Sequence, residues 1–218
     1  MNKEWSELNK AMQRQLKKRE TFPAGIDTLL TLRGQLMETL VSFRRELSRE
    51  DFDAIPFIHA NGLHNKTIAY SLWHIFRIED IVAHTLILAD EQIFFRQGYQ
   101  ARIHSPIITT GNELSKQQIA AFSRQLNLDG LYSYAYEVKE STEKLLQTLP
   151  YDGLRRKITV DRREILAVLH VVSEQEAAAW LIDYWCAKDI RGLIQMPFSR
   201  HWIMHTEACL RIKNKIHP

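Results

Sequence analysis

The sequence predicts an all-α protein, and three observations support this. Glycine and proline are scarce, at 8 and 6 of 218 residues, and they separate segments in which apolar residues recur at three- and four-residue steps. The only strand-like runs, ITV at 158–160 and PIITT at 106–110, are short. A chain of this length with 45% hydrophobic residues can build one large core, so we expect a single domain over residues 1–218.

The N-terminal part predicts two helices. The first covers residues 3–20 and makes residues 1–25 a helical extension of a core that spans about 26–216. The second runs over 27–49, and its apolar residues follow helical spacing: Leu29, Leu32, Leu36, Leu40 and Phe43. Residues 50–66 then form a connection, because breakers such as Pro and Gly interrupt the pattern there.

The middle of the chain predicts two further long helices. The first spans 66–90, where an apolar stripe lies beside a second stripe that carries His74 and Arg77. A small helix follows, with Ser115 as its candidate N-cap. The second long helix opens at Asp129 and ends before Pro150.

The last part of the chain predicts a pair of helices over 161–195 and a terminal helix capped by Ser199. Gly192 and Pro197 separate the terminal helix from the pair. Four long amphipathic segments, beginning near 27, 66, 129 and 199, suffice for a bundle around one core.

Composition excludes several classes of protein. The formal net charge is only +3 and no concentrated basic stripe is present, so we expect no nucleic-acid partner. No apolar run approaches the ~20 residues that cross a bilayer, so we expect no membrane partner. Two cysteines, Cys186 and Cys209, do not suggest a disulfide framework, which favours a reducing, cytoplasmic location.

Two histidines near the C-terminus, His201 and His205, are four residues apart on the terminal helix. Residues i and i+4 share one helix face, so both imidazoles can reach one metal ion. The pair equally fits a solvated helix face, and two ligands on one helix rarely suffice for a metal site. His74, within the apolar stretch SLWHIFRIED, is the natural third ligand, although a core imidazole hydrogen-bonded to another helix would give the same pattern.

Two motifs together closely resemble the DinB/YfiT-like superfamily of metal-dependent four-helix-bundle proteins. They are TIAYSLWHIFRIEDIVAHTLI at 67–87 and MPFSRHWIMHTEACLRI at 196–212. The resemblance implies a DinB-like four-helix bundle with additional short helices, and it implies His74, His201 and His205 as ligands of a divalent ion. Tyr70 stands where the family more often has Trp, and HTEA replaces the more usual H-L-N-E.

Side chains near these histidines have alternative roles. Glu79 and Asp80 could cap the bundle end or accept a hydrogen bond from an imidazole. Arg77 could bind an anion or pair with Asp80, and Cys209 could approach the metal as a fourth, soft ligand or be a small buried side chain. The aromatic residues of the helical pair could fill the core or line a pocket: Trp180, Tyr184 and Trp185. His59 and His64, in the connection, could border the mouth of a site.

Two functions compete. The resemblance implies a metal-dependent transferase or hydrolase, because some relatives in the superfamily transfer low-molecular-weight thiols. A three-histidine ion with open positions could bind such a thiol or activate water. The alternative is a non-enzymatic, stress-associated helical bundle that acts through its dimer surface. Imidazole ligands suit zinc, nickel and iron alike, so the ion is not identified. The resemblance also implies a homodimer, and a small-molecule substrate fits the enzymatic alternative.

Overall fold

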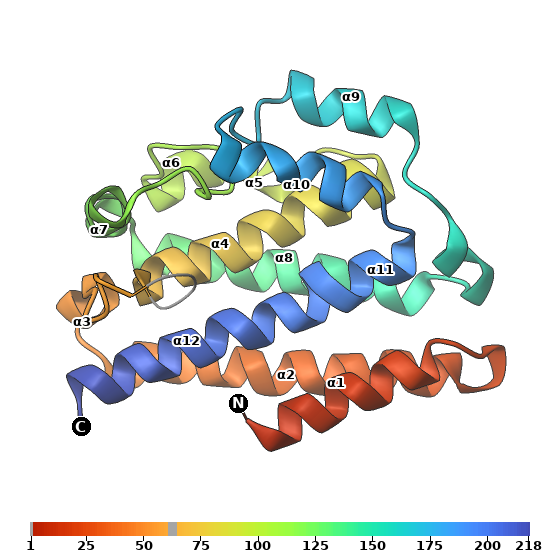
Figure 1. Ribbon diagram of the computed structural model, residues 1–218, viewed down its shortest axis with the longest axis horizontal. Coiled ribbons are helices and arrows are strands. Elements are labelled where there is room, and N and C mark those ends of the chain that lie inside the picture. The colour runs from red at the N-terminus through yellow and green to blue at the C-terminus, as the bar shows by residue number, and fades with distance from the viewer. Residues whose placement is uncertain (1, 61–64) are drawn as a thin grey trace.

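The computed structural model describes residues 2–60 and 65–218, and no β-strand forms within them (Figure 1). An isolated bridge between Lys157 and Asp189 is the sheet-like pairing in this part of the chain. The all-α prediction is therefore confirmed for the described residues. The predicted connection over 50–66 is described only in part, and His64 lies outside the described residues.

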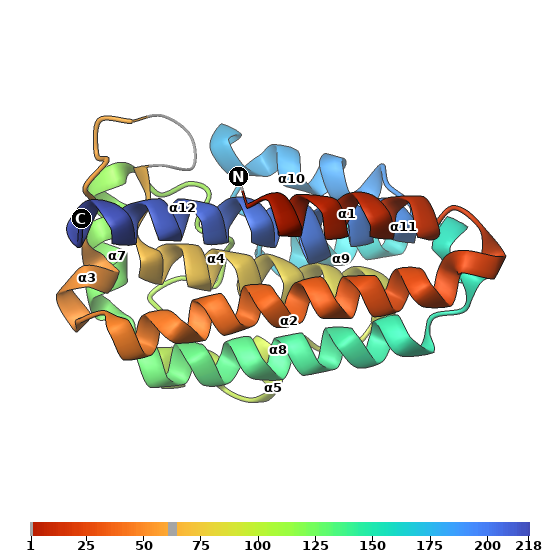
Figure 2. The same ribbon diagram turned by 90° about the horizontal axis from the view of Figure 1, so that it is seen from below.

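Four long helices form a helical bundle. They are α2 (Phe22–Glu46), α4 (Ile68–Asp80, continued by the π-helical segment η3, Ile81–Leu88), α8 (Leu128–Thr148) and α12 (His201–Ile216). Helices α2 and α4 each contact both α8 and α12, so the four close into a ring around the core. Figures 1 and 2 show α2 running antiparallel to α8, and α4 antiparallel to α12. Helix α4 thus presents one side to the start of α12.

The core runs the length of this bundle. One buried cluster gathers around Phe43, Trp73 and Trp202, and a second gathers around Leu29 and Ile81. Residues 68–87 are buried at every position, on the polar as well as the apolar stripe. Buried polar groups must find partners or bind a ligand, so the polar residues of α4 have to be accounted for.

Shorter helices flank the bundle. They are α1 (Lys3–Gln15), η1 (Arg19–Thr21), α3 (Arg49–Asp53), α5 (Ile93–Arg96), α6 (Tyr99–Ile103), α7 (Lys116–Gln125), η4 (Tyr151–Arg155), α9 (Val160–Val168), α10 (Glu176–Cys186), α11 (Ile190–Gln195) and η5 (Met196–Arg200). Helix α1 folds back along α2 and buries Trp5 and Met12. Helix α10 lies above the bundle in Figure 1, on the side of α4. Among the described helices, none has the length and apolar character needed to cross a bilayer.

Several predicted helix boundaries were wrong. Ser199 does not cap the last helix: its hydroxyl donates to Ile194 O, 3.0 Å away, inside a helical run that continues from α11 through η5 into α12. Pro197 does not end that run: it lies at the start of the π-helical segment η5, after Met196, whose φ of −118° and ψ of −73° depart from regular helical geometry. Helix α2 starts at Phe22 rather than Asp27 because Pro23 occupies a first turn, where a missing N–H costs little. The Ser115 cap of α7 is confirmed.

Candidate metal centre

Three histidines from two facing helices come together inside the bundle. His74 lies in α4, and His201 and His205 occupy the first turns of α12. The ring centroid of His74 is 5.0 Å from that of His201 and 4.8 Å from that of His205, and the last two are 4.5 Å apart. One ligand atom from each residue lies within 4.8 Å of the others, and all three residues are buried. This group could hold one metal ion after small side-chain rotations.

A backbone carbonyl orients His74. The His74 Nδ1–H donates to Thr110 O at 2.7 Å, and because a carbonyl oxygen can only accept, the proton must sit on Nδ1. The Nε2 atom therefore keeps its lone pair and can act as a ligand. Histidine ligands of metals usually have such a partner, which sets the tautomer and the ring orientation.

The same segment is held at two further points by α4. The Tyr70 hydroxyl donates to Gly111 O at 3.0 Å and Arg77 Nε donates to Ile108 O at 2.9 Å. Tyr70, His74 and Arg77 are spaced so that all three lie on one side of α4. Gly111 has a φ of 76°, and a Cβ there would come within 3.0 Å of the Tyr70 ring, so only glycine fits. The strand-like run at 106–110 is thus fixed by side-chain donors and not by a sheet.

A buried charged group anchors the start of α12. Trp202 Nε1 donates to Glu79 at 2.7 Å, and Arg33 donates to both carboxylate oxygens of Glu79 at 2.7 and 2.9 Å. Arg33 also donates to Phe198 O and to Glu143. The Arg33 and Glu79 side chains are both 0% exposed. This group joins α2, α4 and α12 one residue beyond His201, so it holds the histidine pair opposite His74.

Burial keeps the three imidazoles neutral. It lowers the pKa of His74 to about 4, and it holds the pKa of His201 and of His205 well below its ordinary range, with neighbouring histidines adding to the effect. Near pH 7 no proton therefore competes with a metal for the ring nitrogens. His201 Nδ1 and His205 Nδ1 are buried without a hydrogen-bond partner among the described residues. Three neutral, converging rings, two of them with an unpartnered Nδ1, fit a divalent ion.

A cavity of about 290 Å³ opens over the histidines. The three imidazoles border one side of it, and Trp180, Leu181, Tyr184 and Trp185 of α10 border another. The alternative in which these aromatic residues line a pocket is therefore confirmed. Trp185 is buried, whereas Trp180 is 50% exposed. The cavity joins the candidate ligands to solvent along an apolar wall.

The acidic residues after His74 serve other partners. Glu79 takes Arg33 and Trp202, and Asp80 accepts hydrogen bonds from the backbone N–H groups of Ile93 and Phe94 at 2.9 Å. Neither carboxylate receives an N–H from a ligand Nδ1, because the Nδ1 atoms of His201 and His205 have no partner among the described residues and His74 Nδ1 donates to Thr110 O. Sequence spacing cannot reveal such a partner, since any residue supplies a carbonyl.

Arg77 and Cys209 take the structural alternatives. Arg77 is fully buried, with Nη1 3.6 Å from Asp80 Oδ2 and its guanidinium over the Phe94 ring. Cys209 is a core residue and does not belong to the group of converging ligand atoms. Burial raises its pKa to about 12, so the thiol stays protonated. A fourth, thiolate ligand is therefore not supported.

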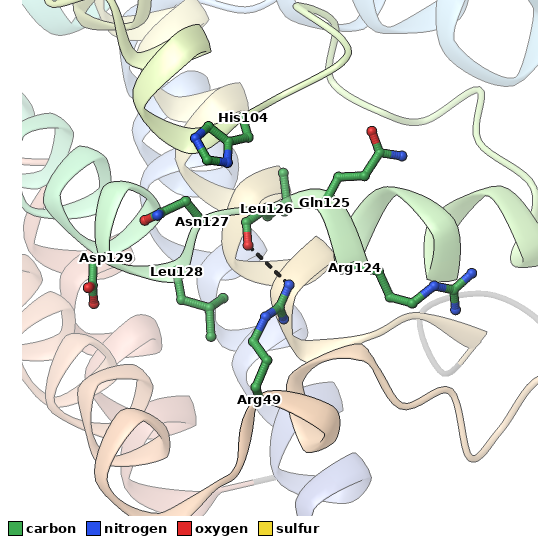
Figure 3. A pocket seen from close by; sticks show the side chains of 8 residues that line it. All are labelled: Arg49, His104, Arg124, Gln125, Leu126, Asn127, Leu128 and Asp129. Carbon is green, nitrogen blue, oxygen red and sulfur yellow. Dashed lines mark hydrogen bonds between the residues drawn. The ribbon is translucent and has the colours of Figure 1, made fainter.

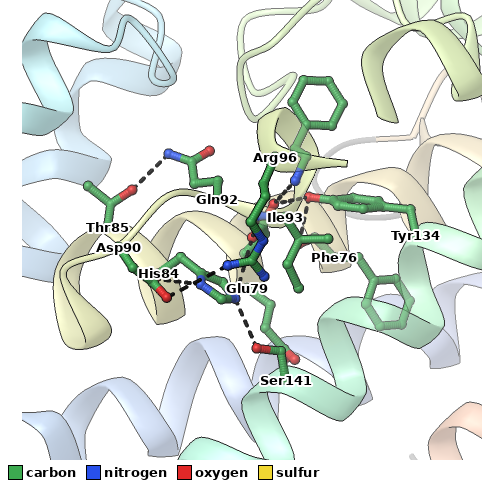
Figure 4. A network of polar contacts seen from close by, with 12 residues as sticks. Phe76, Glu79, His84, Thr85, Asp90, Gln92, Ile93, Arg96, Tyr134 and Ser141 are labelled. Atoms are coloured by element: carbon green, nitrogen blue, oxygen red, sulfur yellow. Dashed lines mark hydrogen bonds and ion pairs between the residues drawn. The ribbon is translucent and has the colours of Figure 1, made fainter. Parts of the chain in front are cut away.

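His84 shows how this fold satisfies a buried imidazole. His84 Nδ1 is 2.7 Å from Asp90 Oδ1 and Nε2 is 3.1 Å from Ser141 Oγ (Figure 4). Both ring nitrogens are engaged, so His84 has none left for a metal. The hydrogen-bonded series Ser141–His84–Asp90 has the residue types of a hydrolase triad. However, the backbone N–H groups around Ser141 are bonded within α8, so they cannot form an oxyanion hole.

A second hollow, of about 370 Å³, lies where α7 joins α8 (Figure 3). Arg49 reaches across it to Leu126 O at 3.0 Å. Two of its charged residues have ion-pair partners, since Arg49 pairs with Asp53 and Asp129 pairs with Arg44. His104 borders this hollow and not the three-histidine cavity. Among the described residues, the group of converging metal-ligating side chains lies in the three-histidine cavity and not here.

Arg33 is the anchoring residue that sequence reasoning missed. It interrupts the apolar stripe of α2 between Leu32 and Leu36, and an arginine in such a stripe indicates a buried, paired charge.

No protein-family model matches this sequence, and no curated protein matches it either. Over the described residues, the structure itself shows an all-helical protein with a buried three-histidine group.

Proposed function

We propose that this chain is a divalent-metal-binding protein of the DinB/YfiT-like superfamily, with His74, His201 and His205 as the ligands of zinc, nickel or iron. The order of the two motifs supports this assignment. So does the ring of four long helices, in which α4 and α12 face each other at the three histidines. We extend the proposal to a four-helix bundle of the DinB type, with α9 and α10 as additions.

We further propose that the site carries out transfer or hydrolysis on a small molecule. The observation that carries this is the opening of three neutral, buried imidazoles onto a cavity of about 290 Å³. A divalent ion held there would supply Lewis acidity, which lowers the pKa of a thiol or a water molecule that binds it. Three protein ligands leave room for such a molecule.

The residues of the chain have definite tasks in this proposal. Thr110 O keeps the proton of His74 on Nδ1, so that Nε2 remains a ligand throughout. The apolar wall from α10 limits water around the reacting groups. In thiol transfer, sulfur forms a bond to an electrophilic carbon while the bond to a leaving group, the C–O bond of an epoxide or the C=C π bond of an unsaturated carbonyl compound breaks. The electron pair of the broken bond goes to the leaving group, or it stays on the substrate, which then takes up a proton. The thiol proton passes to solvent. In hydrolysis, water oxygen takes the place of sulfur.

Metal analysis of the purified protein tests the site. We expect about one divalent ion per chain in the wild type, by X-ray fluorescence or elemental analysis. His74→Ala and His201→Ala should each lose it. His217→Ala is the matched control, because His217 is exposed and pairs with Asp51 outside the cavity. Retention of the metal by both site variants would contradict the proposal.

Turnover distinguishes the enzyme from the non-enzymatic alternative. The metal-loaded chain is mixed with cysteine or another small thiol and with aryl halides, epoxides and unsaturated carbonyl compounds. We expect product formation above the rate of free thiol, and its loss in His201→Ala. Stoichiometric metal with no turnover across this panel would favour a structural metal in a bundle that acts through its surface. The homodimer stays a prediction, which light scattering of the purified chain would check.

A further inference from the structure

The walls of the three-histidine cavity are apolar and aromatic. Trp180 and Tyr184 of α10 meet edge to face, with ring centroids 5.6 Å apart at an interplanar angle of 71°. Trp180 Nε1 donates to Ala177 O at 3.0 Å, so the polar group of the indole is already used. Pro197 and Met204 complete the apolar lining. An occupant therefore meets ring faces and alkyl groups here, which suit an apolar or aromatic body.

Polar groups gather at the opposite end. Asn112 Oδ1, His201 Nδ1 and His205 Nδ1 are buried without a hydrogen-bond partner among the described residues, and all three residues line the cavity. A hydroxyl or amine donor on the occupant would satisfy Asn112 Oδ1. The occupant is thus expected to be polar at the histidine end and apolar at the α10 end.

The volume limits the size of the occupant. A cavity of about 150 Å³ lined by apolar side chains accommodates benzene. The present cavity, at about 290 Å³, has roughly twice that volume and is open on the side of the half-exposed Trp180. A two-ring molecule, or one ring with a short chain, fits this space.

We infer that the site takes an aromatic molecule of about two rings, with its ring system against Trp180 and Tyr184 and a hydrogen-bond donor toward Asn112. The inference rests on the proposed function for the reactive end of the molecule. The recognition of the ring system depends only on α10 and the adjoining residues of η5 and α12. The substrate class of the proposed reaction is therefore an aromatic electrophile.

Binding of an aromatic probe and of its saturated counterpart tests this selection. The probes are 2-naphthol and decahydro-2-naphthol, which share the carbon skeleton and the hydroxyl group. Calorimetric titration of the purified full chain should give a Kd for 2-naphthol about threefold or more below that of decahydro-2-naphthol, because only the aromatic probe gains ring–ring contacts. Equal or tighter binding of the saturated probe would overturn the inference.

Substitution of the wall locates the binding. Trp180→Ala should raise the Kd for 2-naphthol about tenfold, because one aromatic wall is lost. Trp180 is 50% exposed, so this variant should fold. Tyr136→Ala is the matched control, since Tyr136 is 44% exposed on α8 and does not line this cavity, and its Kd should equal that of the wild type. An unchanged Kd in Trp180→Ala would overturn the inference.

Metal analysis and titration with 2-naphthol, taken together, separate this inference from the proposed function. If the chain binds no metal and 2-naphthol still binds in a Trp180-dependent way, the metal proposal fails and the inference on the aromatic wall stands. If the chain binds metal through the three histidines but shows no Trp180-dependent binding of 2-naphthol, the inference fails and the metal site stands.

Discussion

Two buried polar groups lie between α4 and α12, and they are satisfied in opposite ways. In the Arg33–Glu79 group, each guanidinium nitrogen of Arg33 has an acceptor, and Glu79 also receives Trp202. In the histidine group, His201 Nδ1 and His205 Nδ1 have none among the described residues. The first group offsets the cost of burying charge and fixes the helices. The second leaves a desolvation cost uncompensated, which a bound ion would offset.

His84 sharpens this comparison, because it is an imidazole buried as deeply as the other three. Asp90 and Ser141 engage both of its ring nitrogens. The fold can therefore satisfy a buried histidine where it has no ligand to bind. Among the buried histidines of the described residues, His201 and His205 are the two that keep an unpartnered Nδ1.

The largest expected effect comes from breaking the Arg33–Glu79 group. Glu79→Leu should lower the free energy of unfolding by about 3–5 kcal/mol, because it leaves the Arg33 charge buried without its main partner. Urea unfolding followed by circular dichroism measures this. The double variant Arg33→Met, Glu79→Leu should recover most of the loss. A double variant no more stable than Glu79→Leu would contradict the assignment of the loss to an unpaired charge.

Metal addition should act on the other group. With zinc at a free concentration of about 100 times its Kd, the wild type should gain about 2.7 kcal/mol in the free energy of unfolding. His205→Leu should gain nothing, because it lacks one of the three ligands. Thermal unfolding with and without zinc compares the two chains. A matching gain in His205→Leu would place the metal elsewhere.

Leucine substitutions made in the presence of a chelator compare the two kinds of buried imidazole. His201→Leu should raise the free energy of unfolding by about 1 kcal/mol, since it removes an unsatisfied buried nitrogen. His84→Leu should lower it by about 1–2 kcal/mol, since Asp90 and Ser141 lose their partner. Urea midpoints give both values. Changes of the same sign in the two variants would remove the distinction.

The smallest effect concerns the thiols and their pH dependence. Burial raises the pKa of Cys209 to about 12, above the ordinary value of about 8.5, so only about one thiol in a thousand is ionised at pH 9 in the folded chain. Between the unfolded pKa of about 8.5 and the folded pKa of about 12, the folded state therefore keeps a Cys209 proton that the unfolded state has lost. The contribution of Cys209 to the free energy of unfolding is complete below this pH range and declines as pH rises through it.

Iodoacetamide should label the half-buried Cys186 before the buried Cys209, as mass spectrometry would show. Equally fast labelling of Cys209 in the native chain would contradict its burial.

Periodicity and composition were enough to predict the helical class, and the residue spacing with the family resemblance was enough to nominate His74, His201 and His205. The helix boundaries near Pro23 and Pro197 could not be predicted, because proline ends a helix in its interior and is tolerated in a first turn. The sequence alone does not show whether a proline lies in a helix interior or in a first turn, because the packing of neighbouring helices decides where each helix begins.

The sequence by itself determined which side chains can share a helix face, since an i,i+4 step places His201 beside His205 wherever that helix lies. Only the tertiary structure decided that this face meets His74, that Thr110 O receives the His74 proton and that α10 covers the opening with Trp180. The reason is physical: helix geometry is local and periodic, whereas a backbone carbonyl or a cavity wall is supplied by whichever distant segment packs there.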